Sequence, residues 1–403
     1  MSARQEHTIP SAAREEATAL AARADTVISE EALAAKLAAG CPLRVKLGVD
    51  PTAPDIHLGH GIVLEKLREF QDAGHEAILI IGDFTAMIGD PSGRSVTRPQ
   101  LDHGQVLANA TSYQEQAFKI LSTERSRIVF NGEWFEAMSF EEVIRLNSRV
   151  TLQQMLQRED FRERMDAGHP VRAHEIQYPI MQGWDSVKIR ADVELGGTDQ
   201  LFNILVGRDL QQAEGQAAQV AMTMPILVGL DGKQKMSKSL GNYVALNESA
   251  RDMFGKIMSI SDEVMAHYYP ALLKESLPGD LHPMEAKKLL AARVATRFHG
   301  TAEAAAARED FETRFAKRDL ENSELPDFQP SVGAGDIVSV VVDAYARCFG
   351  ITKTRGDARR LVEGGSIRWR NEKFADPKAL FPTGEPGVLK LDKTRAVRVA
   401  GGE

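Results

Sequence analysis

Residues 45–60, VKLGVDPTAPDIHLGH, contain the change of pattern that decides the fold. Residues 45–49 form a short apolar run, which predicts a buried strand, and an amphipathic helical pattern follows at 61–73. The alternation is repeated further along, with apolar strands predicted at 77–83, 127–130 and 223–229 and a helix at 105–122. It predicts an α/β fold, a Rossmann-like parallel sheet with helices on both faces. Ligands of such sheets bind at the carboxyl ends of the strands.

The patterns divide the chain into five expected segments. Apolar and helical spacing, together with a stretch rich in Pro, Ser, Asp and Gly near residues 321–335, suggest the boundaries. The expected segments are an N-terminal helical arm (1–40), a Rossmann-like catalytic domain (41–245) with a helical insertion at about 135–190, a helical domain (246–325), a linker (326–338) and a small C-terminal domain (339–403).

The overall composition is that of a globular protein. The chain has 403 residues, of which 43% are hydrophobic and 26% charged. Since no apolar run approaches the roughly 20 residues that span a bilayer, and the N-terminus does not resemble a signal or transit peptide, we expect a cytoplasmic protein with no membrane partner. Cys41 and Cys348 form no CxxC pair, so neither a disulfide framework nor a cysteine-rich zinc site is expected.

Charge is distributed unevenly between the body and the tail of the chain. The formal net charge is −8, yet residues 351–403 hold 12 Lys and Arg against 7 Asp and Glu. A basic tail on an acidic body suggests a small nucleic-acid contact. Charge alone, however, favours the simpler interpretation of a solvated basic surface.

The first candidate motif is the pair His57 and His60, which flank Leu58-Gly59 where a helix is expected to begin. A helix N-terminus offers free N–H groups and a positive dipole end to phosphate, and Gly59 allows close approach of a nucleotide. The histidines can donate hydrogen bonds to phosphate oxygens whose charge grows in a transition state. By itself the HxGH pattern also fits two ordinary histidines at a helix start.

The second motif is KMSKS at residues 235–239, flanked by Gly232 and Gly241. Lys235 and Lys238 can neutralise one polyphosphate, and flanking glycines suit a loop that closes over a nucleotide. Alone, it could equally be a solvated basic turn. Taken together, the two motifs resemble the HIGH and KMSKS signatures of class I aminoacyl-tRNA synthetases. The resemblance implies that both motifs, including Met236 and Ser237, hold ATP during formation of an aminoacyl adenylate.

A third set of residues points to the amino acid. Pro179 predicts the first turn of a helix, and Tyr178, Gln182 and Asp185 then share one helix face. Spacing alone also fits a polar helix surface. The arrangement resembles the substrate helix of tyrosyl-tRNA synthetases. The resemblance implies that Tyr178 and Gln182 hold the α-amino group and that Asp185 accepts the phenolic proton.

Other segments resemble the same family, from about residue 40 to the end of the chain. The matching residues are distributed over several loops, and their roles are implied by the resemblance alone. They are Asp90 (amino group), Thr85 and Asn131 (tyrosine pocket), Gln200 (tyrosine and its carboxyl), Gly197 and Asp199 (ribose), Asp50 and Thr52 (adenylate, with Thr52 grouped among the catalytic residues), and Arg94 and Arg98 (pyrophosphate).

Two positions depart from the other bacterial subtype of this family. That subtype has a Tyr beside the substrate hydroxyl where this chain has Lys46, and its Gln-Ala-Tyr-Asp is QGWD at residues 182–185 here. Asp185 keeps its implied role. Lys46 and Trp184 receive no binding role.

The tail resembles an S4-type RNA-binding module, a small α+β domain in which a basic helix and the following strands contact RNA phosphates. The resemblance implies that Arg355, Arg359, Arg360 and Lys373 bind RNA and that the helical domain 246–325 binds the anticodon. It also implies ATP with Mg²⁺ and no tightly bound metal, tyrosine and tRNA(Tyr) as the other substrates, and a homodimer.

Three other functions remain open from the residues alone. A tryptophanyl-tRNA synthetase shares the fold and both nucleotide motifs, but the tail and the Tyr178/Gln182/Asp185 face argue against it. A nucleotidylyltransferase uses an HxGH step but would not need the lysine loop with an RNA-binding tail. A non-catalytic RNA-binding protein with a synthetase fold would not need chemically capable residues at every proposed position.

Overall fold

The computed structural model describes residues 9–52, 54–92, 103–313, 325–330, 335–370, 372–374, 376–382, 385–392 and 395–400. The chain forms two compact units. Unit 1 comprises Met1–Ser249 and Lys256–Val294, and unit 2 comprises Ala250–Gly255 and Ala295–Glu403. The expected boundary between residues 245 and 246 therefore differs from the observed division, because the helical segment contributes to both units.

Unit 1 is built on a six-stranded sheet with the order β1-β6-β5-β2-β3-β4. Five strands run parallel, which confirms the predicted α/β class. They are β2 (Arg44–Val49), β3 (Glu76–Ile81), β4 (Ser126–Phe130), β5 (Val193–Gly197) and β6 (Val220–Met224). Residues 77–81 of β3 are each at most 1% exposed, as expected of a strand covered on both faces.

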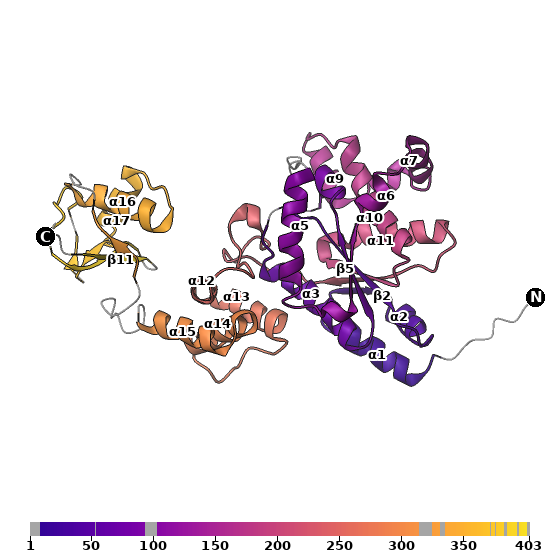
Figure 1. Ribbon diagram of the computed structural model, residues 1–403, viewed down its shortest axis with the longest axis horizontal. Coiled ribbons are helices and arrows are strands. Elements are labelled where there is room, and N and C mark those ends of the chain that lie inside the picture. The colour runs from indigo at the N-terminus through magenta and orange to yellow at the C-terminus, as the bar shows by residue number, and fades with distance from the viewer. Residues whose placement is uncertain are drawn as a thin grey trace, which may run out of the picture. The chain divides into compact units, whose positions relative to one another are not determined.

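Helices cover both faces of this sheet (Figure 1). Lys46 on β2 reaches α10 (Ala173–Ile189), so its neighbour Leu47 points to the opposite face, where α3 (Leu58–Asp72) packs. Helix α11 (Leu201–Ala213) lies against α10 at a point of close backbone approach. A Cβ added to Gly183 would lie 2.9 Å from the backbone nitrogen of Gly207, so the two helices require glycine at this crossing.

The N-terminal arm contains a short strand in addition to the expected helices. Between α1 (Ser11–Ala21) and α2 (Glu30–Leu37), the short strand β1 (Thr26–Ile28) pairs antiparallel with β6 and forms an edge of the sheet. A three-residue strand is too short to produce a periodic signal, which is why the sequence predicted only helix there. Strand β5 was not predicted either, and β6 begins three residues before the expected strand at 223–229.

The insertion between β4 and α10 is helical, as predicted. It contains α6 (Gly132–Phe135), α7 (Phe140–Asn147), α8 (Leu152–Met155) and α9 (Glu159–Asp166). The expectation that α10 starts at Pro179 is wrong, because the helix already begins at Ala173 and Pro179 lies inside it. Proline removes one backbone hydrogen bond. The helix nevertheless continues through Pro179, with the N–H of Arg172 donating to the carboxylate of Glu175 over 2.9 Å at its start and with α11 packed against it.

The described residues from 246 to 313 form helices joined by short connections, with no strand among them, as expected. Its elements are α12 (Ala250–Met258), α13 (Asp262–Tyr268), a π-helical turn (Tyr269–Leu273), α14 (Pro283–His299) and α15 (Thr301–Phe311). None of the helices in the described part of the chain is both long and apolar enough to cross a bilayer.

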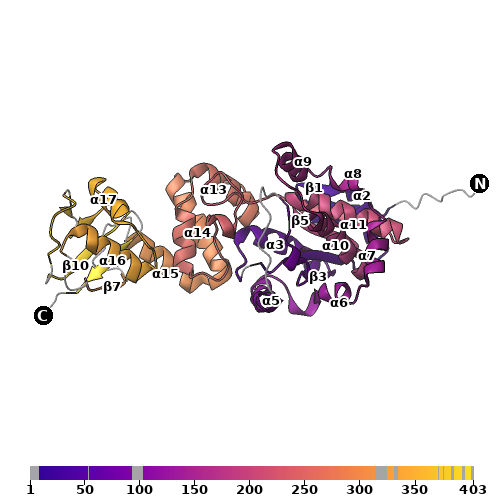
Figure 2. The ribbon, with the colours of Figure 1, turned by 90° about the horizontal axis from the view of Figure 1, so that it is seen from above.

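The C-terminal part of unit 2 has an α+β architecture, which Figure 2 shows from above. Helices α16 (Ile337–Phe349) and α17 (Arg355–Glu363) share a core with a five-stranded sheet of order β7-β11-β10-β8-β9. The strands are β7 (Asp327–Phe328), β8 (Arg368–Trp369), β9 (Glu372–Lys373), β10 (Gly387–Lys390) and β11 (Ala396–Val399). The expected linker at 326–338 differs from this structure, since β7 joins the sheet and α16 starts within it. Pairing of β7 with the distant β11 has no local sequence signal.

Candidate active site

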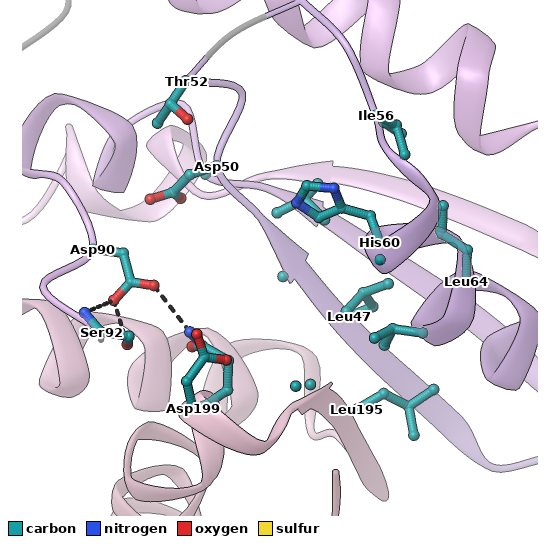
Figure 3. A pocket seen from close by; sticks show the side chains of 18 of the residues that line it. Leu47, Asp50, Thr52, Ile56, His60, Leu64, Asp90, Ser92, Leu195 and Asp199 are labelled. Carbon is teal, nitrogen blue, oxygen red and sulfur yellow. Dashed lines mark hydrogen bonds between the residues drawn. The ribbon is translucent and has the colours of Figure 1, made fainter. Parts of the chain in front are cut away.

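A cavity of about 630 Å³ lies at the carboxyl ends of the parallel strands. Its walls follow β2, β3, β5 and β6, with β2 and β5 at the point where the strand order reverses, the usual ligand position in such sheets. Figure 3 shows Asp50, Asp90 and Asp199 around it. The predicted site residues that line this one cavity are Asp50, Thr52, His57, Gly59, His60, Thr85, Asp90, Asn131, Tyr178, Gln182, Asp185, Gly197, Asp199, Gln200, Lys235, Met236, Ser237 and Lys238. Arg94 and Arg98 lie outside the described residues.

The histidine motif forms the start of α3. His57 is the N-cap, its backbone N–H donates to Nδ1 of His60 over 3.4 Å, and the two ring centroids are 3.8 Å apart. Burial, together with the positive charges of Lys238 and Lys235, lowers the pKa of His57 to about 3. His57 is therefore neutral at pH 7 and can present an N–H to a phosphate oxygen without carrying charge.

The two nucleotide motifs are held together by backbone hydrogen bonds. The N–H of Leu58 donates to the carbonyl of Val244 over 3.0 Å, and the N–H of Leu246 donates to the carbonyl of Ile56 over 2.8 Å. The segment that leaves the lysine loop thus runs beside the start of the histidine motif. Motifs about 175 residues apart in sequence become neighbours through this pairing.

Both lysines of the KMSKS loop line the cavity and contact protein partners. Nζ of Lys235 is 2.8 Å from Oδ2 of Asp199. Nζ of Lys238 donates to the hydroxyl oxygen of Tyr113 over 2.6 Å and to the carbonyl of Asp55. Tyr113, on α5 (His103–Ala117), was not singled out from the sequence, because nothing local relates it to a residue 125 positions away.

The loop itself is supported by Asn242. Its Oδ1 accepts from the N–H of Ser237 over 2.8 Å, and its Nδ2 donates to Asp231 over 2.9 Å and to the carbonyl of Lys235 over 3.2 Å. These contacts fix the backbone on both sides of Met236, whose side chain is buried.

Asp185 is a buried carboxylate surrounded by N–H donors. It is 3% exposed, and it accepts from Nδ2 of Asn131 over 3.3 Å and from Nε1 of Trp134 over 3.1 Å. Burial raises the pKa of Asp185 to about 7, although the charge of Lys46 and both hydrogen bonds act in the opposite direction. Trp134, which supports Asp185 through this contact, was not singled out from the sequence.

A second carboxylate, Asp50, joins the end of β2 to helix α10. Its Oδ2 accepts from the hydroxyl of Tyr178, and its Oδ1 accepts from the hydroxyl of Thr85, each over 2.9 Å. A Cβ added to Gly82 would lie only 2.1 Å from Oδ1 of Asp50. Glycine is therefore required for this arrangement.

A chain of polar contacts links Asp90 to Gln182. Oδ1 of Asp90 accepts from the hydroxyl of Ser92 over 2.6 Å, and Oδ2 accepts from Nε2 of Gln200 over 2.9 Å (Figure 3). Nδ2 of Asn203 donates to Oε1 of Gln200 over 3.1 Å and to Oε1 of Gln182 over 2.9 Å. The three predicted residues are thereby held in one network through Asn203.

The helical insertion supports this network through Arg158, another residue that the sequence did not reveal. Its guanidinium is 4% exposed and donates to the hydroxyl of Ser92 over 2.6 Å and to Oδ1 of Asn203 over 3.0 Å. It also pairs with Asp160 at 2.7 Å.

Lys46 pairs with Glu194 on β5, and both side chains are at most 1% exposed. Its Nζ is 2.9 Å from Oε1 of Glu194 and donates to the carbonyl of Gln182 and to the hydroxyl of Ser186, each over 2.7 Å. Lys46 therefore connects helix α10 to the sheet.

One cavity thus combines groups suited to two kinds of ligand. Two lysines, the neutral His57 with its neighbour His60, and a helix N-terminus suit a polyphosphate. Carboxylates, amides and a buried carboxylate with N–H donors suit a zwitterion that carries a hydroxyl group. Among the described residues, no group of three or more His, Cys, Asp or Glu is arranged to hold a metal ion.

Comparison with known proteins agrees with this combination. A family model described as tRNA synthetases class I (W and Y) matches residues 39–316. The chain is 47% identical to the tyrosine–tRNA ligase of Aquifex aeolicus, over 93% of this chain and 96% of that protein. It is 48% identical to the tyrosine–tRNA ligase of Oleidesulfovibrio alaskensis, over 92% and 95%. The chain belongs to the class I tyrosine–tRNA ligases.

Solved tyrosyl-tRNA synthetases share the fold. The C-terminally truncated mitochondrial enzyme of Aspergillus nidulans has a TM-score of 0.61 at 22% identity, covering 75% of this chain and 94% of that one. The Archaeoglobus fulgidus enzyme, complexed with L-tyrosine, has a TM-score of 0.60 at 21% identity, covering 73% and 99%.

In this tyrosine–tRNA ligase family member, the predicted RNA-binding residues lie in the α+β part of unit 2. Arg355, Arg359 and Arg360 are exposed on α17, and Lys373 is exposed on β9. Arg355 is also engaged locally, since its guanidinium is 2.8 Å from Asp336, the N-cap of α16. Backbone and side-chain donors from Ser339, together with Arg355, lower the pKa of Asp336 to about 2.

Proposed function

We propose that this chain activates tyrosine with ATP and then transfers it to tRNA(Tyr). An oxygen of the tyrosine carboxylate attacks the α-phosphorus, the bond to the bridging oxygen of pyrophosphate breaks, and tyrosyl adenylate forms. A hydroxyl of the terminal tRNA ribose then attacks the carbonyl carbon of the adenylate, and AMP leaves. Neither step needs a covalent enzyme intermediate, so the protein acts by positioning the reactants and stabilising charge.

The observation that carries the proposal is the buried Asp185, which shares a cavity with Lys235, Lys238 and the histidine pair. We assign Asp185 to the phenolic hydroxyl of tyrosine. When phenylalanine binds instead, the carboxylate stays buried without this partner. A site built to bind a hydroxyl group therefore rejects the amino acid that lacks it.

The remaining cavity groups divide between the two substrates. We assign Tyr178, Gln182, Asp90, Thr85, Asn131 and Gln200 to tyrosine, and Asp50, Gly59, Gly197, Asp199, Met236 and Ser237 to ATP. His57, His60, Lys235, Lys238 and Thr52 would act on the phosphates in the transition state. Arg94 and Arg98 are proposed pyrophosphate contacts on grounds of resemblance only.

Mg²⁺ is the proposed companion of ATP, where it neutralises phosphate charge. This ion usually keeps several waters and is bound by phosphates and one or two carboxylates. In this cavity Asp50 already accepts from Thr85 and Tyr178, and Asp199 is paired with Lys235. We therefore propose that phosphate oxygens and water supply most of its ligands.

We also propose a homodimer. Phe140 and Ile144 lie four residues apart on α7 and are 79% and 53% exposed, and Leu152 on α8 is 59% exposed. Large exposed apolar side chains that gather on neighbouring elements often mark a protein interface. Sedimentation equilibrium, with Phe140→Ser as the dissociating variant, tests this assembly.

The tRNA is the proposed partner of the basic tail through Arg355, Arg359, Arg360 and Lys373. The tail carries a net charge of +5 on a chain that is acidic overall, and these four side chains are exposed. Phosphate contacts of this kind supply affinity and position the RNA without reading its sequence. Because tRNA charging serves translation, the proposed location is the cytoplasm.

Amino-acid-dependent ATP–pyrophosphate exchange tests the reaction most directly. The assay uses the full chain with each of the twenty amino acids and no tRNA. We expect exchange with tyrosine and not with phenylalanine. Exchange with tryptophan would contradict the pocket assignment, and no exchange with any amino acid would refute the proposed activity.

A further inference from the structure

Helix α5 presents a polar face that holds the loop before the histidine motif. Nδ2 of Asn109 donates to the carbonyl of Pro51 over 2.9 Å, and Oγ of Ser112 donates to the carbonyl of Pro54 over 2.8 Å. Gln116, which is fully buried, donates to Pro54 over 2.7 Å and accepts from the N–H of Ile56 over 2.7 Å. Spacings of three and four residues place these side chains on one side of the helix.

Tyr113 lies on the same helix, next to Ser112, and contacts the lysine loop. Its side chain is 2% exposed, its hydroxyl oxygen is 2.6 Å from Nζ of Lys238, and its ring centroid is 4.8 Å from the same nitrogen. The ring also meets His60 edge-on at 6.5 Å. Tyr113 therefore contacts one residue of each nucleotide motif and lines the cavity.

Two oxygen atoms accept hydrogen bonds from Nζ of Lys238. They are the hydroxyl oxygen of Tyr113 and the carbonyl oxygen of Asp55, a residue that lies just before the histidine motif. Lys235, by comparison, pairs with the carboxylate of Asp199. The ammonium group of Lys238 is thereby oriented beside the histidine motif.

We propose that Tyr113 is a positioning residue that holds the Lys238 ammonium in place for the phosphates of ATP. The inference rests on the proposed tyrosine activation. A lysine on a loop has a flexible side chain, and ordering it at the moment of reaction costs conformational entropy. An orientation that exists before ATP binds lowers that cost, because correctly placed groups need no rearrangement in the transition state.

Kinetics of Tyr113→Phe test the role of the hydroxyl, since the ring and its packing are kept. We expect kcat/KM for ATP in tyrosine-dependent exchange to fall about tenfold, the effect of losing one hydrogen bond to a charged group. The KM for tyrosine should change less than about twofold, because the residues assigned to tyrosine lie on other elements. Tyr269→Phe is the matched control, since it removes a buried hydroxyl that donates to the carbonyl of Ala286 in the helical segment.

A double-mutant cycle with Lys238→Ala separates positioning from general structural damage. Once the lysine is absent, adding Tyr113→Phe should alter activation by less than about twofold, because coupled residues are not additive. A tenfold loss in both backgrounds, a KM for tyrosine that rises about tenfold, or faster activation by Tyr113→Phe would each overturn the proposal. A wild-type chain without tyrosine-dependent exchange would instead refute the proposed function.

Discussion

Asp185 shows how burial and hydrogen bonding compete at one residue. Burial in the cavity wall raises its pKa to about 7, while the N–H groups of Asn131 and Trp134 favour the ionised form. A carboxyl pKa raised above its ordinary value means that the folded chain binds a proton more tightly than the unfolded chain. Ionisation of Asp185 therefore destabilises the empty protein increasingly as the pH rises from about 4 to about 7.

Tyrosine should relieve this destabilisation, because its phenolic O–H can donate to the ionised carboxylate. We predict that the increase in melting temperature caused by tyrosine is larger at pH 8 than at pH 6, measured by thermal unfolding with saturating ligand. Phenylalanine is the control, and the increase in melting temperature that it causes should be no larger at pH 8 than at pH 6. A tyrosine effect that is equal at both pH values, or greater at pH 6, would contradict the assignment of Asp185 to the phenol.

At the scale of elements, the Lys46–Glu194 pair fixes helix α10 on the sheet. The pair joins β2 and β5, and Lys46 further contacts the carbonyl of Gln182 and the hydroxyl of Ser186 on α10. Glu194 also accepts from Ser186 over 2.9 Å. Because α10 carries Tyr178, Gln182 and Asp185, these buried charges set the position of the face that we propose to bind tyrosine.

Removing one member of the pair should be far more damaging than removing both. Lys46→Met leaves Glu194 buried and unpaired, and we expect a loss of about 3–5 kcal/mol in the free energy of unfolding. Adding Glu194→Gln should recover part of that loss. Urea denaturation measures the differences. As a control, Arg68→Met breaks the more exposed pair with Asp72 and should cost no more than about 1 kcal/mol. A double variant as unstable as the sum of the single variants would contradict the pairing.

At the scale of the whole molecule, the cavity proposed for the two small substrates and the basic residues proposed to bind RNA belong to different units of the chain. The cavity is formed by residues 47–239 of unit 1, whereas the exposed basic residues of α17 and β9 belong to unit 2. Substitution in unit 2 should therefore affect tRNA charging without affecting tyrosine activation.

Arg359→Ala combined with Lys373→Ala tests this separation in the full chain. We expect ATP–pyrophosphate exchange to stay unchanged and the KM for tRNA to rise. The slope of log KM against log salt concentration should decrease by about one for each phosphate that is no longer neutralised. Aminoacylation measured at several salt concentrations gives both quantities. Arg14→Ala, an exposed basic residue on α1, serves as the control. Slower pyrophosphate exchange in the double variant would show that the two parts are not independent in this way.

Sequence patterns predicted the α/β class and the edge of the sheet at which the cavity lies. Apolar runs define β2, β3 and β4, and parallel strands place the residues that follow them at one edge of the sheet. For this reason the residues that follow Val49, Asp83 and Phe130 could be expected near one another. The helical face of Tyr178, Gln182 and Asp185 was likewise predictable, because a period of 3.6 residues is a local property.

Only the tertiary structure decided which partners these residues have. Trp134 contacts Asp185, Arg158 holds the turn at Ser92, and Tyr113 binds Lys238, through pairs separated by 51, 66 and 125 residues. The short strand β1 and the continuation of α10 through Pro179 also depend on distant packing. Periodicity tells which face of an element is buried, but a buried charge finds its partner only when the elements pack. Candidate residues could therefore be proposed from the sequence and its family resemblance, whereas the contacts that hold them could not.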